Sequence, residues 1–310
     1  MHGNDAGEVN MRLIVHMGLH KTGSTYLQHI FNDNHEALLG RGVYYQKQPG
    51  YPAHHFGAWD ILRGDTSAIE TMVGEARIAG CHTIILSSED LEGAIFDRGT
   101  AASIEAAALA SGVEGIEWHI CVRDPGEYFA SLYAQLQHHV FADPLAMLCE
   151  VLRDGMMMIL DPSPGERATP YWCYCFDHGR YISAFAAGTE HPVILHDFKD
   201  REPFPGWRIL DRVGALDAIS RLPGREGRNG RLEADAVRAG YRDRILNLVT
   251  DEARRRKLLP LIDAQLRSSG ESVACYAEIV GDQFADSMAA ALAEFGERQG
   301  EGSPDRRACA

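Results

Sequence analysis

The sequence has no long apolar run. No stretch approaches the roughly 18 to 20 consecutive apolar residues that a helix needs to cross a bilayer, and residues 1–10 are polar and lack the hydrophobic segment of a signal peptide. We therefore expect a cytoplasmic protein without a membrane span.

The chain also lacks an excess of positive charge. It has 30 Lys and Arg against 44 Asp and Glu, for a formal net charge of −14. Binding to nucleic acid depends on neutralising many phosphates, so this balance argues against a nucleic-acid partner, although a local basic pocket is compatible with it. Of the 310 residues, 45% are hydrophobic and 24% charged, which is typical of a folded protein.

The seven cysteines show no framework spacing. Their odd number and irregular positions favour reduced thiols. Cys173 and Cys175 form a lone C-x-C without a second pair at metal-ligand spacing. We assign no metal site.

Short apolar runs alternate with helix-like stretches along the chain. Strands are predicted at 13–17, 83–86, 116–122 and 193–195, and helices at 26–34, 66–79, 101–111, 232–249 and 272–299. This alternation predicts a three-layer α/β fold with a mainly parallel central sheet flanked by helices. We assign 11–299 to a single domain, between a flexible leader at 1–10 and a disordered tail at 300–310.

The first predicted strand leads into a glycine-containing turn at 18–25 and then a helix. This arrangement directs several backbone N–H groups and the positive end of a helix dipole at one point, which suits a phosphate group. Gly18 and Gly23 permit close backbone approach, Lys21 supplies a positive charge, and Ser24 and Thr25 add hydroxyl donors. The turn is therefore a candidate phosphate loop.

A second candidate phosphate site follows the strand predicted at 116–122. Asp124 can cap the next helix and Pro125 can occupy its first turn, which leaves Arg123 at the carboxyl end of the strand, where open α/β sheets bind ligands. Ser131 lies about two helical turns further on. The spacing alone does not decide whether Arg123 and Ser131 reach one phosphate.

Two motifs resemble those of the sulfotransferase family, especially its bacterial members. The string H-x-G-x-x-K-T-G-S-T-x-L-Q at 16–28 is similar to the family's 5'-phosphosulfate loop, and R-x-P-x-x-x-x-x-S-x-Y at 123–133 is similar to its 3'-phosphate site. The resemblance implies a P-loop-like fold and a metal-independent enzyme. Such an enzyme transfers the sulfuryl group of 3'-phosphoadenosine 5'-phosphosulfate to a hydroxyl or amine and releases adenosine 3',5'-bisphosphate.

The resemblance also implies roles for individual residues. Lys21 would stabilise the charge that develops on the leaving oxygen. A looser match places a basic loop at 221–231 over the nucleotide. The implied cofactor-binding residues are His20, Lys21, Thr22, Gly23, Ser24, Thr25, Arg123, Ser131 and Arg228.

The acceptor and the oligomeric state stay open at this point. Carbohydrate, lipid, polyketide, peptide and small phenol are all compatible with the motifs, because pocket shape sets the acceptor. Since sulfotransferases often pair, a homodimer is possible. The segment 140–180, rich in Met and aromatic residues, is predicted to be an insertion over the sheet edge that either covers the acceptor or packs under a long loop.

The acceptor must lose a proton, and members of the family use either His or Glu for this step. Glu89 is our choice, because it follows the strand predicted at 83–86 and so lies at the carboxyl edge of the sheet beside the phosphate loop. His55, or its neighbour His54, is the alternative, although an isolated histidine is more commonly a surface or core residue.

Two other functions compete with this reading. In a nucleotide kinase or NTPase, residues 84–89 would form a degenerate strand-plus-acid magnesium site, but the nucleotide-hydrolase loop has its Lys directly after the second Gly, whereas Lys21 precedes Gly23. In a non-catalytic regulatory protein, the nucleotide pocket would not depend on Glu89 or His55.

Overall fold

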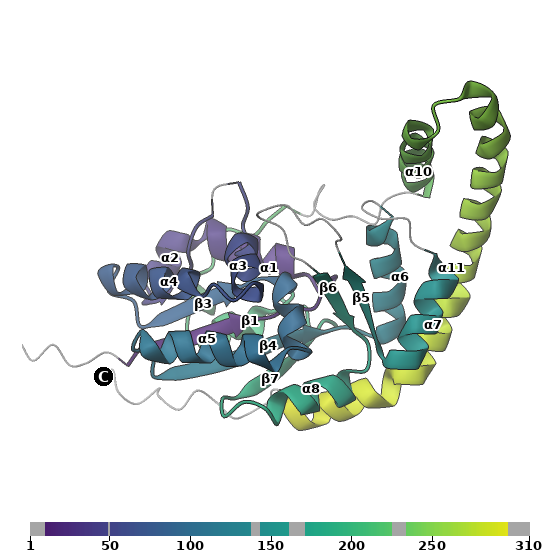
Figure 1. Ribbon diagram of the computed structural model, residues 1–310. Coiled ribbons are helices and arrows are strands. Elements are labelled where there is room, and N and C mark those ends of the chain that lie inside the picture. The colour runs from purple at the N-terminus through teal and green to yellow at the C-terminus, as the bar shows by residue number, and fades with distance from the viewer. Residues whose placement is uncertain (1–9, 49, 138–142, 161–170, 225–233, 297–310) are drawn as a thin grey trace, which may run out of the picture.

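A five-stranded parallel sheet forms the centre of the molecule (Figure 1). The computed structural model describes residues 10–48, 50–137, 143–160, 171–224 and 234–296. The strands, in the spatial order β2-β3-β1-β4-β7, are β2 (Val43–Tyr44), β3 (Thr83–Ser87), β1 (Arg12–His16), β4 (Gly115–Val122) and β7 (Val193–Asp197). The predicted α/β class and parallel sheet are confirmed, and the short edge strand β2 is an addition.

The order of the strands places the loop after β1 at a point where the chain changes direction across the sheet. From β1 the chain goes to β2 and β3 on one side, and then crosses to β4 and β7 on the other. Ligands of open α/β sheets bind outside the carboxyl ends of the strands at such a switch point. The loop after β1 therefore occupies the position where this architecture favours a binding site.

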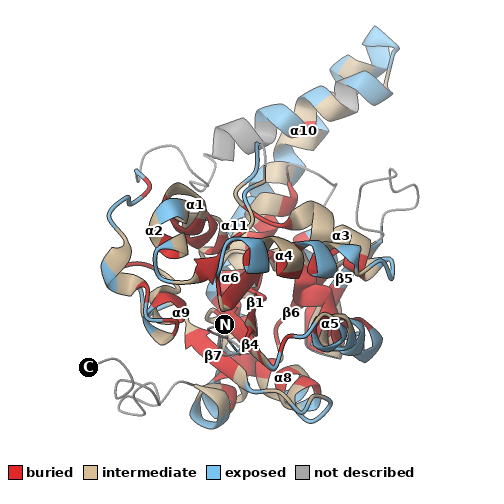
Figure 2. Ribbon diagram, turned by 90° about the vertical axis from the view of Figure 1, so that its left-hand side faces the viewer, coloured by how far each residue is buried: buried red, intermediate tan, exposed pale blue. Residues whose placement is uncertain are grey.

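Helices cover both faces of the sheet, as Figure 2 shows for α1, α2 and α9 on its left and α3 and α5 on its right. Side chains alternate between the faces along each strand: Ile14 packs with the first group of helices, whereas Leu13 and Val15 pack with the second. The helices of the first face are α1 (Ser24–Asp33), α2 (His35–Leu39) and α9 (Trp207–Arg212), and those of the second are α3 (His55–Leu62), α4 (Ser67–Ile78), α5 (Arg98–Ala110) and α8 (His178–Ala186).

A separate apolar core lies beside the sheet. Tyr128, Phe176 and Val280 are among its fully or almost fully buried members. Its elements are α6 (Pro125–Leu136), α7 (Pro144–Asp154), the antiparallel ribbon β5 (Met156–Leu160) and β6 (Tyr171–Cys175), and α11 (Glu252–Phe295). The helix α10 (Ala234–Leu248) and the first half of α11 extend beyond this body (Figure 1).

The segment predicted as an irregular insertion contains regular structure. The helix α7 begins where Asp143 accepts a hydrogen bond from the Ala146 amide at 2.8 Å and Pro144 occupies the first turn, and it ends at Gly155, whose φ is 71°. These are ordinary start and stop signals for a helix. The Met-rich and aromatic-rich runs on either side of residues 161–170 pair as β5 and β6.

The last helix is longer than predicted. The sequence predicted a helix at 272–299, but α11 runs from Glu252 to Phe295 and continues through Pro260 and Gly270. None of the described helices, this one included, combines the length and apolar character needed to cross a membrane. The predicted leader and tail lie outside the described residues, apart from Asn10.

Candidate functional site

The loop between β1 and α1 turns at two residues with left-handed backbone conformation. The φ angle is 63° at Lys21 and 84° at Gly23, and Lys21 is the one described residue other than glycine with a positive φ. Such a conformation costs a non-glycine residue about 1–3 kcal/mol, so the surrounding structure must hold it. Part of that support is the Thr22 hydroxyl, which donates to the Leu19 carbonyl at 2.5 Å.

The backbone N–H groups of this loop are available to an anion. Gly23 is the N-cap of α1, and no side chain caps the helix. Within the described residues, no acceptor pairs with the N–H groups of Lys21, Thr22, Gly23 or Ser24. Since the first N–H groups of a helix and those of a left-handed turn attract negative charge, this backbone can hold a phosphate or sulfate group.

The two loop glycines are required by close packing of the protein itself. A Cβ atom at Gly18 would lie 2.1 Å from the Ser24 hydroxyl oxygen, and one at Gly23 would lie 3.0 Å from Cβ of Pro205. Because Gly18 has no side chain, the end of β1 can lie close to the start of α1. The second distance shows that the segment after β7 closes against the loop.

Arg123 joins the two predicted phosphate motifs. Its Nη1 donates to the carbonyl oxygen of Lys21 at 3.0 Å, while Nε and Nη2 donate to Glu127 at 3.2 and 3.1 Å. Burial, and then the charge of Arg123, lower the pKa of Lys21, while Glu89 opposes that shift. Two cations therefore lie close together at the switch point, where they can stabilise a multiply charged anion.

Sequence reasoning missed the aromatic residue that packs against Arg123. Phe198 comes directly after β7, and the guanidinium carbons of Arg123 and Arg201 lie 4.9 and 5.0 Å from its ring centroid. Its edge would also be 3.3 Å from a Cβ at Gly23. Its position at the carboxyl end of a parallel strand was a usable signal, because such ends meet at one edge of the sheet.

The helix α6 begins as predicted. Asp124 accepts hydrogen bonds from the amides of Gly126 and Glu127 at 3.1 and 3.0 Å, and Pro125 lies in the first turn. Residues four apart share a helix face, so half-buried Ser131 follows Glu127 on that face. Thr25 and Ser24 lie in the first turn of α1, and Arg228 lies outside the described residues.

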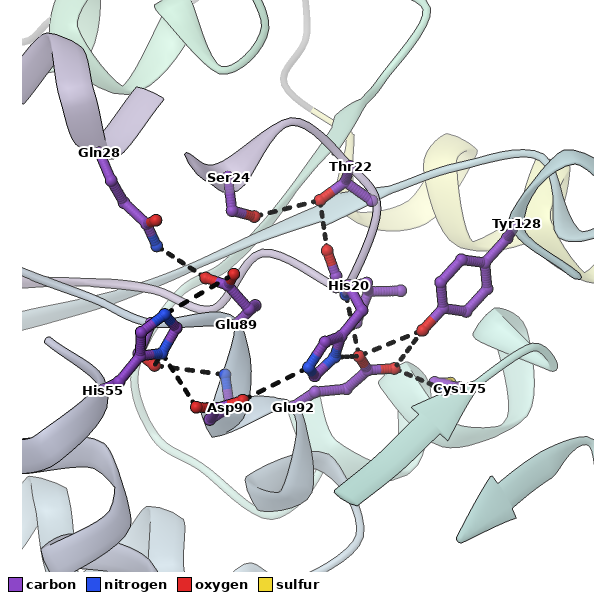
Figure 3. A network of polar contacts seen from close by, with 12 residues as sticks. His20, Thr22, Ser24, Gln28, His55, Glu89, Asp90, Glu92, Tyr128 and Cys175 are labelled. Atoms are coloured by element: carbon purple, nitrogen blue, oxygen red, sulfur yellow. Dashed lines mark hydrogen bonds and ion pairs between the residues drawn. The ribbon is translucent and has the colours of Figure 1, made fainter. Parts of the chain in front are cut away.

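The two candidate bases lie side by side (Figure 3). Nε2 of His55, in the first turn of α3, is 3.9 Å from Oε1 of Glu89, in the 3-10 helix η1 (Glu89–Ile95). Oε2 of Glu89 accepts from Nε2 of Gln28 on α1 at 2.8 Å. Glu89 is thus tied to the helix that starts at the phosphate loop.

His54 has a different environment. It is 1% exposed, its Nδ1 accepts from the Ser87 amide at 3.0 Å, and its Nε2 lies 2.8 Å from the Gln46 carbonyl oxygen. Burial lowers its pKa to about 4. Both ring nitrogens are engaged by backbone, so His54 supports β3 and the start of α3, and its ring is not available to an acceptor.

Asp90 lies between two histidines. Its Oδ2 is 2.9 Å from Nδ1 of His55 and its Oδ1 is 3.4 Å from Nε2 of His20. Trp59 Nε1 also donates to Oδ2 at 2.6 Å. Although burial alone would raise it, the pKa of Asp90 is lowered by its hydrogen bonds to His20 and His55 and by their charges.

The carboxylate of Glu92 anchors the other side of His20. Its Oε2 accepts from both the amide and Nδ1 of His20, at 3.1 and 2.8 Å. Glu92 is fully buried and also accepts from the Cys175 amide at 2.6 Å and the Tyr128 hydroxyl at 3.3 Å. Burial lowers the pKa of His20, but Asp90 and Glu92 outweigh it and raise that pKa to about 10.

These contacts change the picture of His20 as a cofactor ligand. Both ring nitrogens and the amide of His20 are directed at carboxylates, so it would act on a bound anion through its charge and by fixing the position of Lys21. Asp90 and Glu92 stand in the same acidic run as Glu89, which was a signal in the sequence. For Trp59 the sequence held no signal.

In comparisons with protein-family models, curated proteins and solved structures, none matches this chain significantly. Within the described residues, no group of three or more His, Cys, Asp or Glu side chains is arranged to hold a metal ion. The features that bear on function are therefore the loop, the paired cations Lys21 and Arg123, and the acidic cluster of Glu89, Asp90 and Glu92.

Proposed function

We propose that the chain is a sulfotransferase of P-loop-like fold. It would take the sulfuryl group from 3'-phosphoadenosine 5'-phosphosulfate and transfer it to a hydroxyl or amine. The observation that supports this most is the hydrogen bond from Arg123 to the Lys21 carbonyl, because it joins the two motifs that resemble the family's 5'- and 3'-phosphate sites. A ligand with anionic groups at both ends of a nucleotide suits such a pair.

The residues present fit this donor. The unpaired amides of the loop and the Lys21 ammonium suit the 5' end, and Arg123 before α6, with Ser131 within that helix, suits the 3'-phosphate. In-line group transfer depends mainly on positioning and on stabilisation of developing charge. Lys21 supplies that stabilisation at the leaving oxygen, and either Glu89 or His55 takes the acceptor's proton.

The nucleotide kinase remains the second candidate, and one titration separates the two. We expect calorimetry to show micromolar binding of adenosine 3',5'-bisphosphate without metal and no comparable binding of ATP with magnesium. Each of Lys21→Ala and Arg123→Ala removes one charged contact and should weaken the affinity about 10- to 100-fold.

The matched control is Arg41→Ala. Arg41 is paired with Asp217 on the surface and precedes β2, at the opposite end of the parallel strands from the loop. Its replacement should leave the affinity unchanged. Preference for magnesium ATP, or equal weakening by Arg41→Ala, would contradict the proposal. Bisphosphate binding in a protein that never releases sulfate from the donor would favour a regulatory role.

A further inference from the structure

The ring of His55 is oriented by contacts on both of its nitrogens. Nδ1 lies 2.9 Å from Asp90 Oδ2 and 3.1 Å from the Ser88 hydroxyl oxygen, whereas Nε2 faces Glu89 at 3.9 Å. Both neighbours are carboxylates, which only accept hydrogen bonds, but only Asp90 is within hydrogen-bond distance, so the proton of the neutral ring resides on Nδ1. The lone pair of Nε2 is then directed toward Glu89.

Asp90 is held in place more firmly than a surface carboxylate would be. Its side chain is 8% exposed, and it accepts from the Trp59 indole at 2.6 Å as well as contacting both histidines. The Trp59 ring also stacks on His55, with 6.1 Å between centroids and 18° between planes. Trp59 therefore fixes the carboxylate and the imidazole together.

His20 connects this pair to the phosphate loop. It bridges Asp90 and the fully buried Glu92, and it immediately precedes Lys21 in the chain. A displacement of His20 would move both the cation of the loop and the carboxylate that orients His55. The contacts of His20 and Asp90 thus link the phosphate loop to the ring of His55 (Figure 3).

From this arrangement we infer that His55, through Nε2, is the base that takes the acceptor's proton, with Asp90 and His20 as positioning residues. This inference rests on the proposed function and chooses between its two candidate bases. Glu89, held by Gln28 at 2.8 Å, then lies beside the base as a neighbouring charge.

The proton and the bonds balance without a further reactant. As the acceptor oxygen forms its bond to sulfur, its proton moves to Nε2 of His55 and the sulfur–oxygen bond to the leaving phosphate breaks, with the electron pair going to that phosphate oxygen. Nδ1 keeps its proton, and Asp90 stabilises the imidazolium cation that results. The proton on Nε2 is afterwards lost to solvent.

The tautomer and pKa of His55 can be measured in the free protein by nitrogen NMR of its imidazole, assigned by comparison with His55→Gln. Glu89 and Asp90 on η1, His20 on the loop, and Tyr51 and His54 before α3 are the titratable groups around the ring. We expect the Nδ1–H tautomer at alkaline pH. An Nε2–H tautomer in the wild-type protein would overturn the inference, and this result requires no variant to fold.

The positioning role predicts opposite shifts in two variants. Asp90→Asn removes a negative charge in contact with the ring and should lower the pKa of His55 by about 1 to 3 units. His20→Gln removes a nearby positive charge and should raise it. His82→Gln, at the opposite end of β3, is the control and should leave it unchanged. An unchanged pKa in folded Asp90→Asn would contradict the role of Asp90.

A kinetic readout uses the phosphosulfate donor with water as the acceptor. We expect His55→Gln to slow release of adenosine 3',5'-bisphosphate about 10²- to 10⁴-fold, and Asp90→Asn to shift the acidic limb of the rate profile to lower pH. If Glu89→Gln instead causes the large loss and His55→Gln a small one, Glu89 is the base. Calorimetric binding of the bisphosphate tests the proposed function separately, since none of these variants removes Lys21 or Arg123.

Discussion

Two histidines only four residues apart are held in opposite charge states. His20, in the loop after β1, lies between two carboxylates that raise its pKa to about 10 despite its burial. His16, the last residue of β1, is equally buried, but its neighbours are the Ser87 hydroxyl at 2.8 Å and the Cys121 thiol at 3.5 Å, and burial lowers its pKa to about 3. The partner, and not the burial, decides the charge.

The same contrast extends to the regions around them. The loop region is ionic, with Lys21 and Arg123 opposite the acidic cluster of η1. Beneath it, within the sheet, lies a layer of buried histidines, of which His119 is also 3.2 Å from the Glu117 carboxylate. There His119 and His196 stack with 5.1 Å between centroids and share a 2.8 Å contact. Gly18 lies between the two regions, because a Cβ there would be 2.1 Å from the Ser24 hydroxyl oxygen of the loop and 3.0 Å from Nε2 of His16 in the sheet.

The largest expected effect is a loss of folding stability when the ion pairs of His20 are weakened. Glu92→Gln leaves the buried His20 cation with a weakened partner, and loss of one member of a buried ion pair costs about 3–5 kcal/mol. We expect urea unfolding to show a loss of stability of that size. The control is Asp217→Asn, which breaks the exposed pair with Arg41 and should cost at most about 1 kcal/mol. Equal losses in the two variants would show that the His20 network contributes nothing beyond a surface pair.

The dependence of folding stability on pH tests the charge states of both kinds of histidine at once. His16, His54 and His178 have pKa values lowered by burial to about 3, 4 and 4 from 6.5, so only the unfolded chain binds their protons as pH falls below 6.5, and stability should drop toward pH 3. The pKa of His20 is shifted in the opposite direction. The contribution of this histidine is complete below pH 6.5 and is lost as pH rises from 6.5 to about 10.

Thermal unfolding followed across pH should therefore show a maximum near neutrality. In His16→Gln the acid-side decline should become shallower, and in His20→Gln the alkaline-side decline should. A stability that stays constant between pH 7 and 10 in the wild-type protein would contradict the charge state assigned to His20.

A smaller effect concerns the boundary between the regions. In Gly18→Ala the new methyl group would meet the Ser24 hydroxyl, so we expect a loss of about 1–3 kcal/mol and weaker bisphosphate binding. The matched variant is Gly74→Ala within α4, where a Cβ meets nothing within 4 Å and stability should rise by about 0.5–1 kcal/mol. Chemical denaturation of both variants makes the comparison. A stable, fully binding Gly18→Ala protein would refute the boundary role.

The smallest effect is expected for Arg201, which lies beside Arg123 at the edge of the proposed binding site. Arg201 is exposed and lies over Phe198 together with Arg123. An exposed ion pair contributes about 0.2–1 kcal/mol, so Arg201→Ala should weaken bisphosphate binding by at most about fivefold and make it less dependent on salt. Calorimetry at two salt concentrations measures both, and an unchanged affinity would place Arg201 outside the site.

Much of the sheet could be predicted because its central strands are short apolar runs. The strands expected at 83–86 and 116–122 are β3 and β4 to within a residue. The edge strand β2 has two residues and no periodicity to detect. The ribbon of β5 and β6 was missed because its two strands pair across a segment of the chain, and a pairing of that kind leaves no local pattern.

The residues of the candidate site likewise divide into those that the sequence predicted and those that only the fold brings together. Lys21 and Arg123 were expected at one sheet edge, since each follows a parallel strand, and the structure brings them into contact. Glu89 and His55 were expected as alternatives, and they lie 3.9 Å apart. Trp59 lies one helical turn after His55 and Phe198 follows β7, and only the packing of α3 and of the segment after β7 brings them against Asp90 and Arg123.

The sequence by itself determined the α/β class, the glycine turn with Lys21 at its centre, and the cap that places Arg123 at the end of β4, because these depend on local periodicity and on neighbouring residues. The charge of each histidine and the partner of each carboxylate were decided by the tertiary structure alone. A side chain's pKa depends on which groups lie within a few ångströms and how far water is excluded, and residues distant in the chain supply both.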